Sequence, residues 1–69
     1  MMTHQERIRG LREDKDLTQK QIADFLGVAQ TTYSQYETGR RPLPIDYLIA
    51  LCKYYNVSAD YILGFSDHM

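Results

Sequence analysis

Apolar residues recur three and four positions apart along most of the chain, which is the spacing of amphipathic helices. This pattern predicts five short helices, over residues 3–15, 19–26, 30–38, 44–55 and 59–63, followed by a loose tail over residues 65–69. Gly27, Gly39 and Gly64 each stand just past one of these helices, where a residue that tolerates positive φ ends a helix. We therefore expect residues 1–69 to form a single compact all-α domain.

Side chains that cap helix ends support these boundaries. Thr18 followed by Gln21 matches a capping box, in which the hydroxyl and the amide each pair with a free backbone N–H. Pro44 suits the first turn of the fourth helix, where the missing N–H of proline costs nothing. Asn56 is expected to end that helix, and Ser58 to cap the fifth.

The fourth and fifth helices carry more apolar residues than one inward stripe can hold. The inward stripe of the fourth helix is predicted to contain Ile45, Leu48, Leu51, Cys52 and Tyr55. A second set is left to face solvent or a partner: Ile49, Tyr54, Ile62 and Phe65. A contiguous exposed apolar set marks an interface. We therefore expect a homodimer that forms through the C-terminal helices.

Tyrosines and basic residues of the other helices have simpler expected places. Aromatic rings at helical spacing pack in a core with the hydroxyl near water, and we expect this of Tyr33, Tyr36 and Tyr61. The basic residues of the first helix are interpreted as a solvated face, formed by Arg7, Arg9 and Lys15.

Composition argues against several kinds of site. The single cysteine, Cys52, permits no intrachain disulfide, and no Cys/His cluster has metal-ligand spacing. No nucleophile–base pair marks an active site, so we expect no enzyme, cofactor or small-molecule site. The N-terminus lacks the apolar run of a signal peptide, and no stretch has the length of a membrane span, so we expect a cytoplasmic protein. A net charge of −1 argues against a protein that coats nucleic acid nonspecifically.

The third predicted helix has an unusual polar face. Its members carry amides and hydroxyls and no charge: Gln30, Thr31, Thr32, Ser34 and Gln35. Ser and Thr form helices less readily than Lys and Glu, so a merely solvated face would favour the charged residues. Amides pair with adenine in the DNA major groove, and a threonine methyl can contact the thymine methyl. The pattern favours a DNA-reading helix, although a capped polar surface stays open on composition alone.

From Ile8 to Gly64 the chain resembles the lambda-repressor/Cro-like, or XRE-type, helix-turn-helix family. The matching residues are Leu11-Arg12, Leu17-Thr18-Gln19, Ile22-Ala23, Leu26-Gly27-Val28, Tyr33-Ser34, Tyr36-Glu37-Thr38-Gly39, Pro44 through Leu51, and Val57 through Gly64. The resemblance implies a five-helix domain whose third helix enters the major groove.

The resemblance also implies roles for individual residues. The polar residues of the third helix match positions that reach bases or the nearby backbone. DNA-backbone contacts are expected from Gln19, Lys20, Arg40 and Arg41. Arg12 and Glu37 match a structural pair that ties the first helix to the end of the third. Two positions depart from the family pattern, because Ala29 replaces a Ser or Thr cap and Leu43 replaces a basic residue of some relatives.

These expectations describe a sequence-specific regulator of transcription, a repressor, that binds a two-fold operator in double-stranded DNA as a homodimer. Two alternatives stay open. One is an antitoxin-like protein or adaptor of the same fold whose main partner is another protein. The other is a protein-interaction module that makes no DNA contact.

Overall fold

The computed structural model describes residues 3–69 and confirms the predicted all-α fold. Its helices are α1 (His4–Asp14), α2 (Gln19–Leu26), α3 (Gln30–Thr38), α4 (Ile45–Tyr55) and α5 (Ala59–Leu63). These bounds lie within one residue of those expected from the apolar spacing. Residues 1 and 2 of the predicted domain lie outside the described part of the chain.

Side-chain caps explain where the first two helices begin. Thr18 Oγ1 accepts a hydrogen bond from the backbone N of Gln21 at 3.1 Å, and the backbone N of Thr18 donates to Gln21 Oε1 at 2.7 Å. Thr3 and Glu6 form the same reciprocal arrangement at α1, so the helix predicted from residue 3 begins at His4. Both capping boxes satisfy backbone N–H groups that have no partner inside the helix.

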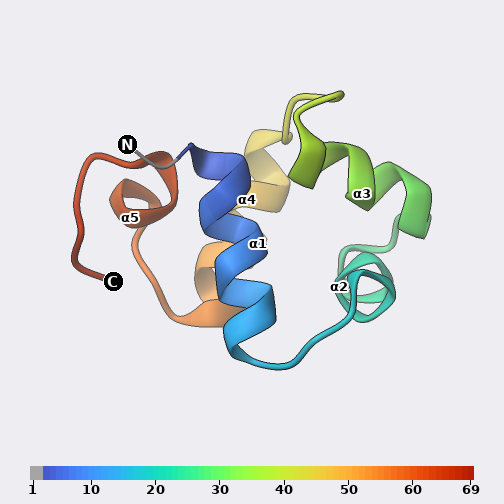
Figure 1. Cartoon of the computed structure of the whole chain (residues 1–69), viewed down its shortest axis with the longest axis horizontal. Helices are drawn as coiled ribbons and strands as arrows, with labels where there is room; N and C mark the ends of the chain where they lie inside the picture. The colour runs from blue at the N-terminus through green and yellow to red at the C-terminus, as the bar shows by residue number, and fades with distance from the viewer. Residues whose placement is uncertain (1–2) are drawn as a thin grey trace.

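The helices are arranged with α2 and α3 at one end of the molecule and α5 at the other (Figure 1). Helices α1 and α4 lie between them, and the start of α1 lies beside α5, against which it packs. One apolar core joins all five helices. Its completely enclosed side chains are Tyr33, Ile8, Ile22, Leu51 and Ile62. This arrangement leaves the outer surfaces of α3 and α5 far apart.

The start of α4 differs from the prediction. Pro44 is the extended N-cap residue, with φ −60° and ψ 146°, and does not belong to the first helical turn. Ile45 was expected to point inward, but 67% of it is exposed. Leu43, just before the helix, packs against the core, and Leu48 takes the inward position one turn after Ile45. The predicted inward stripe is therefore wrong at Ile45.

The predicted exposed set is wrong at Ile62, which is completely buried. Helix α5 packs against both α1 and α4, so Ile62, its buried residue, closes the core. Ile49 and Phe65 are exposed as predicted. Tyr54 is 41% exposed, and its ring lies 4.5 Å from that of Phe25 on α2.

Arg7 of α1, which was expected to face water, contacts the C-terminal tail over residues 65–69. Its side chain is only 10% exposed, because the guanidinium lies over the Tyr61 ring, 4.4 Å from the ring centre. Arg7 Nη2 also pairs with Asp67 Oδ1 at 3.2 Å. The backbone N of Ser58 donates to the Met69 carbonyl at 2.9 Å. The tail is therefore held against α1 and α5, contrary to the loose tail predicted.

Candidate nucleic-acid interface

Helices α2 and α3 form a helix-turn-helix unit. Only residues 27–29 separate the two helices, and Gly27 adopts φ 75°, which a residue with a Cβ rarely tolerates. The backbone N of Val28 donates to the Ala23 carbonyl at 3.0 Å and fixes the turn. Because α2 packs directly on α3, the core-facing side of α3 is covered and its other side is turned outward.

The outward side of α3 is polar and slightly hollow. Thr31, Ser34, Gln35 and Thr38 follow one another at the three- and four-residue spacing of a single helix face. With Arg40 they line a hollow of about 290 Å³. The opposite side of α3 is buried through Tyr33, Tyr36 and Glu37. The structure thus separates the amides and hydroxyls of this helix from its packing residues.

The predicted base-contacting residues do not all lie in the same place. Thr31, Ser34 and Gln35 line the hollow, whereas Gln30 is exposed at the first residue of α3 and Thr32 is half-buried outside the hollow. Thr38 also lines the hollow, although it was not among the predicted contacts. The sequence could have indicated this position of Thr38, because residues seven apart, such as Thr31 and Thr38, lie on the same face of a helix.

The start of α3 has no side-chain cap. Ala29 occupies the N-cap position in extended geometry, with φ −67° and ψ 149°, and offers no side-chain acceptor. A serine there is expected to raise the free energy of unfolding by about 1 kcal/mol, because its hydroxyl would accept a backbone N–H of the first turn. Thermal denaturation should show a melting temperature about 4–8 °C higher.

Ala59→Ser is the matched control for this prediction. Ala59 is likewise exposed at the start of a helix, but it follows Ser58, whose hydroxyl already accepts from the backbone N of Tyr61 at 3.0 Å. We therefore expect Ala59→Ser to leave the melting temperature unchanged. Equal melting temperatures for the two variants would contradict the assignment of a missing cap at Ala29.

Behind the outward face lies a charged cluster that joins α1, α2 and α3. Arg12 Nε donates to Glu37 Oε2 at 2.7 Å, and Arg12 Nη2 donates to Glu37 Oε1 at 3.1 Å. Arg12 Nη1 also donates to the Leu17 carbonyl at 2.8 Å. The side chains are 12% and 2% exposed, respectively, for Arg12 and Glu37. The structure therefore brings the two residues together as a two-point ion pair shielded from water.

Gln19 belongs to the same cluster. Its Nε2 donates to Glu37 Oε1 at 3.2 Å, so the amide at the start of α2 is oriented by the carboxylate from α3. Burial of Glu37 opposes its ionisation, but hydrogen bonding to the carboxylate, above all from Arg12, outweighs that effect and holds the pKa of Glu37 below its ordinary value. Glu37 is thus a carboxylate at neutral pH, a buried charge that is paired.

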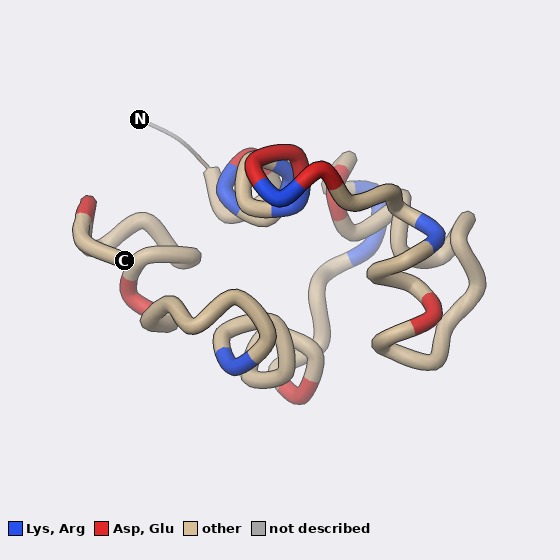
Figure 2. The backbone as a smooth tube through the Cα atoms, turned by 90° about the horizontal axis from the view of Figure 1, so that it is seen from below, with Lys and Arg blue, Asp and Glu red and all other residues tan. Residues whose placement is uncertain are grey.

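The basic residues near α2 and α3 have different surroundings. Lys20 pairs with Asp24 on its own helix, with Nζ 3.1 Å from Oδ2, so part of its charge is already balanced. Arg40 and Arg41 are exposed after α3, and among residues 3–69 neither forms an ion pair. Elsewhere acidic positions lie among the basic ones (Figure 2). The two arginines are therefore the free positive charge nearest the polar face.

Neither a metal site nor a membrane span is found in the part of the chain that the structure describes. Residues 3–69 contain no cluster of three or more His, Cys, Asp or Glu side chains suited to holding a metal ion. Of the helices described, none has the length and apolar character needed to cross a membrane.

Comparison with known proteins identifies the family. The helix-turn-helix family model matches residues 8–62. The uncharacterized HTH-type transcriptional regulator YobD of Bacillus subtilis is 42% identical over 62 residues, which make up 90% of this chain and 55% of that protein. The cryptic phage CTXphi transcriptional repressor RstR of Vibrio cholerae is 37% identical over 51 residues, or 74% of this chain and 46% of the relative. The chain spans about half the length of these curated relatives.

A solved structure agrees with the sequence comparisons. The P22 c2 repressor, crystallised with the synthetic operator 9T in the presence of Tl⁺, superposes with a TM-score of 0.83 and 29% sequence identity. The match covers 96% of this chain and 100% of the repressor chain. The resemblance inferred from the sequence is therefore confirmed: the chain belongs to the helix-turn-helix family of lambda-repressor-like, XRE-type transcriptional regulators.

Proposed function

We propose that this protein binds double-stranded DNA in a sequence-specific way and represses transcription. The observation that carries the proposal is the outward face of α3, where Thr31, Ser34 and Gln35 line a hollow on the side of the helix opposite its buried residues. The major groove admits one α-helix and displays a distinct donor and acceptor pattern for each base pair. A repressor of the same fold was crystallised with a synthetic operator, which supports DNA binding here. Since the named relatives are bacterial, we place this action in the cytoplasm.

Residues around α3 have separate roles in this proposal. Side chains of α3 read bases: Gln30, Thr31, Thr32, Ser34 and Gln35. Gln19, Lys20, Arg40 and Arg41 contact the DNA backbone. Few unpaired basic residues surround the face, and phosphate neutralisation supplies much of the free energy of DNA binding. We therefore expect modest affinity at physiological salt.

Selection of bound duplexes from a random pool, followed by mobility-shift titration of the winners, tests this function. We expect one enriched half-site and tighter binding to it than to scrambled duplex. Failure to enrich any sequence, with no shift of any duplex at low salt, would reject DNA binding. It would favour the antitoxin-like or adaptor alternative.

The contribution of Arg40 and Arg41 is measurable through salt dependence. Replacing either by Ala is expected to weaken binding to specific and nonspecific duplexes alike, because a phosphate contact carries no sequence information. The slope of log K against log salt should fall by about one unit for each phosphate that the variant no longer neutralises.

Arg9→Ala provides the matched control for these variants. Arg9 is an exposed arginine on α1 that pairs with Glu13 on its own helix, 3.5 Å away. Its removal should leave the salt slope unchanged. If the Arg40 and Arg41 variants also keep the wild-type slope, the loop after α3 does not lie on the DNA backbone.

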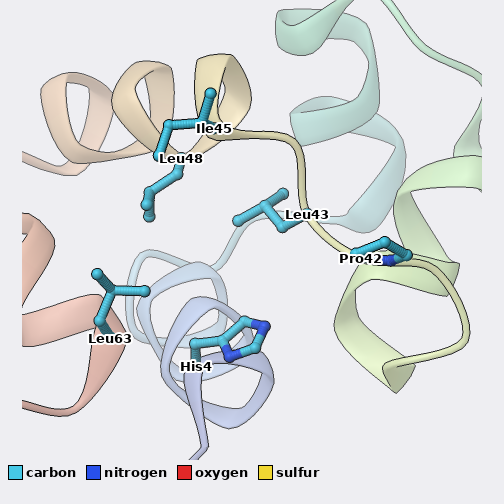
Figure 3. A pocket seen from close by; sticks show the side chains of 6 residues that line it. All are labelled: His4, Pro42, Leu43, Ile45, Leu48 and Leu63. Atoms are coloured by element: carbon cyan, nitrogen blue, oxygen red, sulfur yellow. The ribbon is translucent and has the colours of Figure 1, made fainter.

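We further propose a homodimer that forms through α5 and the start of α4. The surface there holds an apolar pocket of about 320 Å³ (Figure 3), lined by His4, Pro42, Leu43, Ile45, Leu48 and Leu63. Exposed Ile49 lies one turn beyond Ile45, and Phe65, two residues after Leu63, is 81% exposed. Helix α5 lies at the end of the molecule opposite α3 (Figure 1), so two subunits that meet through α5 can keep both recognition helices free.

Sedimentation with a two-fold duplex tests the dimer. Wild type is expected to bind as two subunits, with recognition helices about one helical turn of DNA apart. Ile49→Lys should leave one subunit per duplex, because the charge would be buried at the contact. Phe25→Ser is the control, because it changes an exposed aromatic residue of α2 that packs on Tyr54. This variant should still bind as two subunits per duplex. Two subunits for the Ile49 variant would exclude this surface.

A further inference from the structure

The outward side of α3 offers a restricted set of base-reading groups. Its side chains carry amides and hydroxyls, and the nearest free cation, Arg40, lies beyond the end of the helix, after Gly39. The only carboxylate of α3 belongs to Glu37, which is buried and bound by Arg12 and Gln19. Guanine is most often read by a bidentate Arg or Lys, and cytosine by a carboxylate acceptor. Neither kind of reader projects from this face.

The same face is equipped for adenine and thymine. A glutamine amide forms paired hydrogen bonds with adenine N6 and N7, and a threonine methyl packs on the thymine C5-methyl. Among the hydrogen bonds of residues 3–69, none engages the side-chain amide of Gln30 or Gln35, in contrast to that of Gln19. Thr31 is exposed and lines the hollow together with Gln35, and it directly follows Gln30 at the start of α3.

The axial separation of the two glutamines on α3 is comparable with the rise of two base-pair steps in B-DNA. Gln30 and Gln35 are five residues apart, which corresponds to about 7.5 Å along a helix that rises 1.5 Å per residue. Base pairs in B-DNA are stacked roughly 3.4 Å apart. The two amides therefore span about two base-pair steps, with Thr31 next to the first of them.

We infer that the bases beneath α3 form a short A·T run, with adenines facing Gln30 and Gln35 and a thymine methyl facing Thr31. This inference rests on the proposed DNA binding and names the chemistry that the site recognises. Specificity arises from the amides and the methyl group, while Arg40 and Arg41 supply affinity without reading sequence.

Modified duplexes test the inference atom by atom. In the selected half-site, each thymine is replaced in turn by deoxyuridine, which lacks the C5-methyl group. One such replacement should weaken wild-type binding about three- to fourfold, the value of one buried methyl group. Thr31→Ser, which lacks the side-chain methyl, should bind the two duplexes equally. Thr3→Ser, which makes the same change at the cap of α1, should keep the wild-type difference.

A second modification tests the amides. Replacing one adenine by 7-deazaadenine removes the N7 acceptor and should weaken wild-type binding about fivefold or more. Gln35→Ala, or Gln30→Ala for the other adenine, should be insensitive to that replacement. Selected half-sites with G·C pairs at these positions, or a Thr31→Ser variant that still detects the thymine methyl, would overturn the inference and leave DNA binding intact. Failure to bind any duplex would instead reject the proposed function, and this inference with it.

Discussion

Glu37→Ala is expected to lower the free energy of unfolding by about 3–5 kcal/mol, the typical cost of removing one member of a buried ion pair. The change leaves the Arg12 guanidinium, which is 12% exposed, without the two hydrogen bonds it donates at 2.7 and 3.1 Å. Arg12→Ala should cost a similar amount, because the Glu37 carboxylate is even more deeply buried. Against a total stability of about 5–15 kcal/mol for a small domain, either change is severe. Urea denaturation measures both.

The control for this prediction is Asp24→Ala. It removes an exposed ion pair with Lys20, whose side chains are 68% and 64% exposed, and should change stability by less than about 0.5 kcal/mol. A double-mutant cycle on Arg12 and Glu37 should show strong coupling. Additive effects would mean that the pair does not act as a unit, and a destabilisation no larger than that of the control would show that it is effectively exposed.

The same pair predicts how stability depends on pH. The pKa of Glu37 is lower in the folded protein than its ordinary value of 4.5. A depressed carboxyl pKa contributes stability above the unfolded pKa, and this contribution disappears as the pH falls through the folded pKa. The difference in stability between wild type and Glu37→Gln should therefore be constant near neutral pH and shrink below about pH 4.5.

Replacing Gln30 or Gln35 by Ala is expected to weaken binding to the selected operator by about 1–3 kcal/mol, roughly five- to 150-fold. Each change removes a side chain that can pair with a base but takes no part in the core. Mobility shifts on the operator and on scrambled duplex measure the effect. Binding to scrambled duplex should change little, since phosphate contacts dominate nonspecific affinity.

Thermal denaturation is the control that separates recognition from folding in these variants. Gln30 is exposed and Gln35 half-buried on the outer side of α3, so both variants should melt within about 2–4 °C of wild type. If both bind the operator as tightly as wild type, α3 does not read its bases, whatever the affinity of the protein for DNA.

Local sequence signals determined the helices and the chemistry of α3. Apolar spacing located all five helices. The Thr18–Gln21 capping box marked the start of α2, and Gly27, which adopts φ 75° in the structure, marked the turn between α2 and α3. Such signals act between residues a few positions apart, so they can be recognised without knowledge of the fold. For the same reason, the polar composition of residues 30–35 was evident before any packing was known.

Tertiary structure decided which side chains are buried and what the polar ones bind. Ile62 was expected outside and Ile45 inside, and the structure reverses both, because α5 packs on α1 and α4 while α4 begins only at Ile45. Arg7 is covered by Tyr61, and Gln19 is bound by Glu37 from another helix. Burial depends on how helices distant in sequence cross and pack, which the apolar period of one helix does not specify.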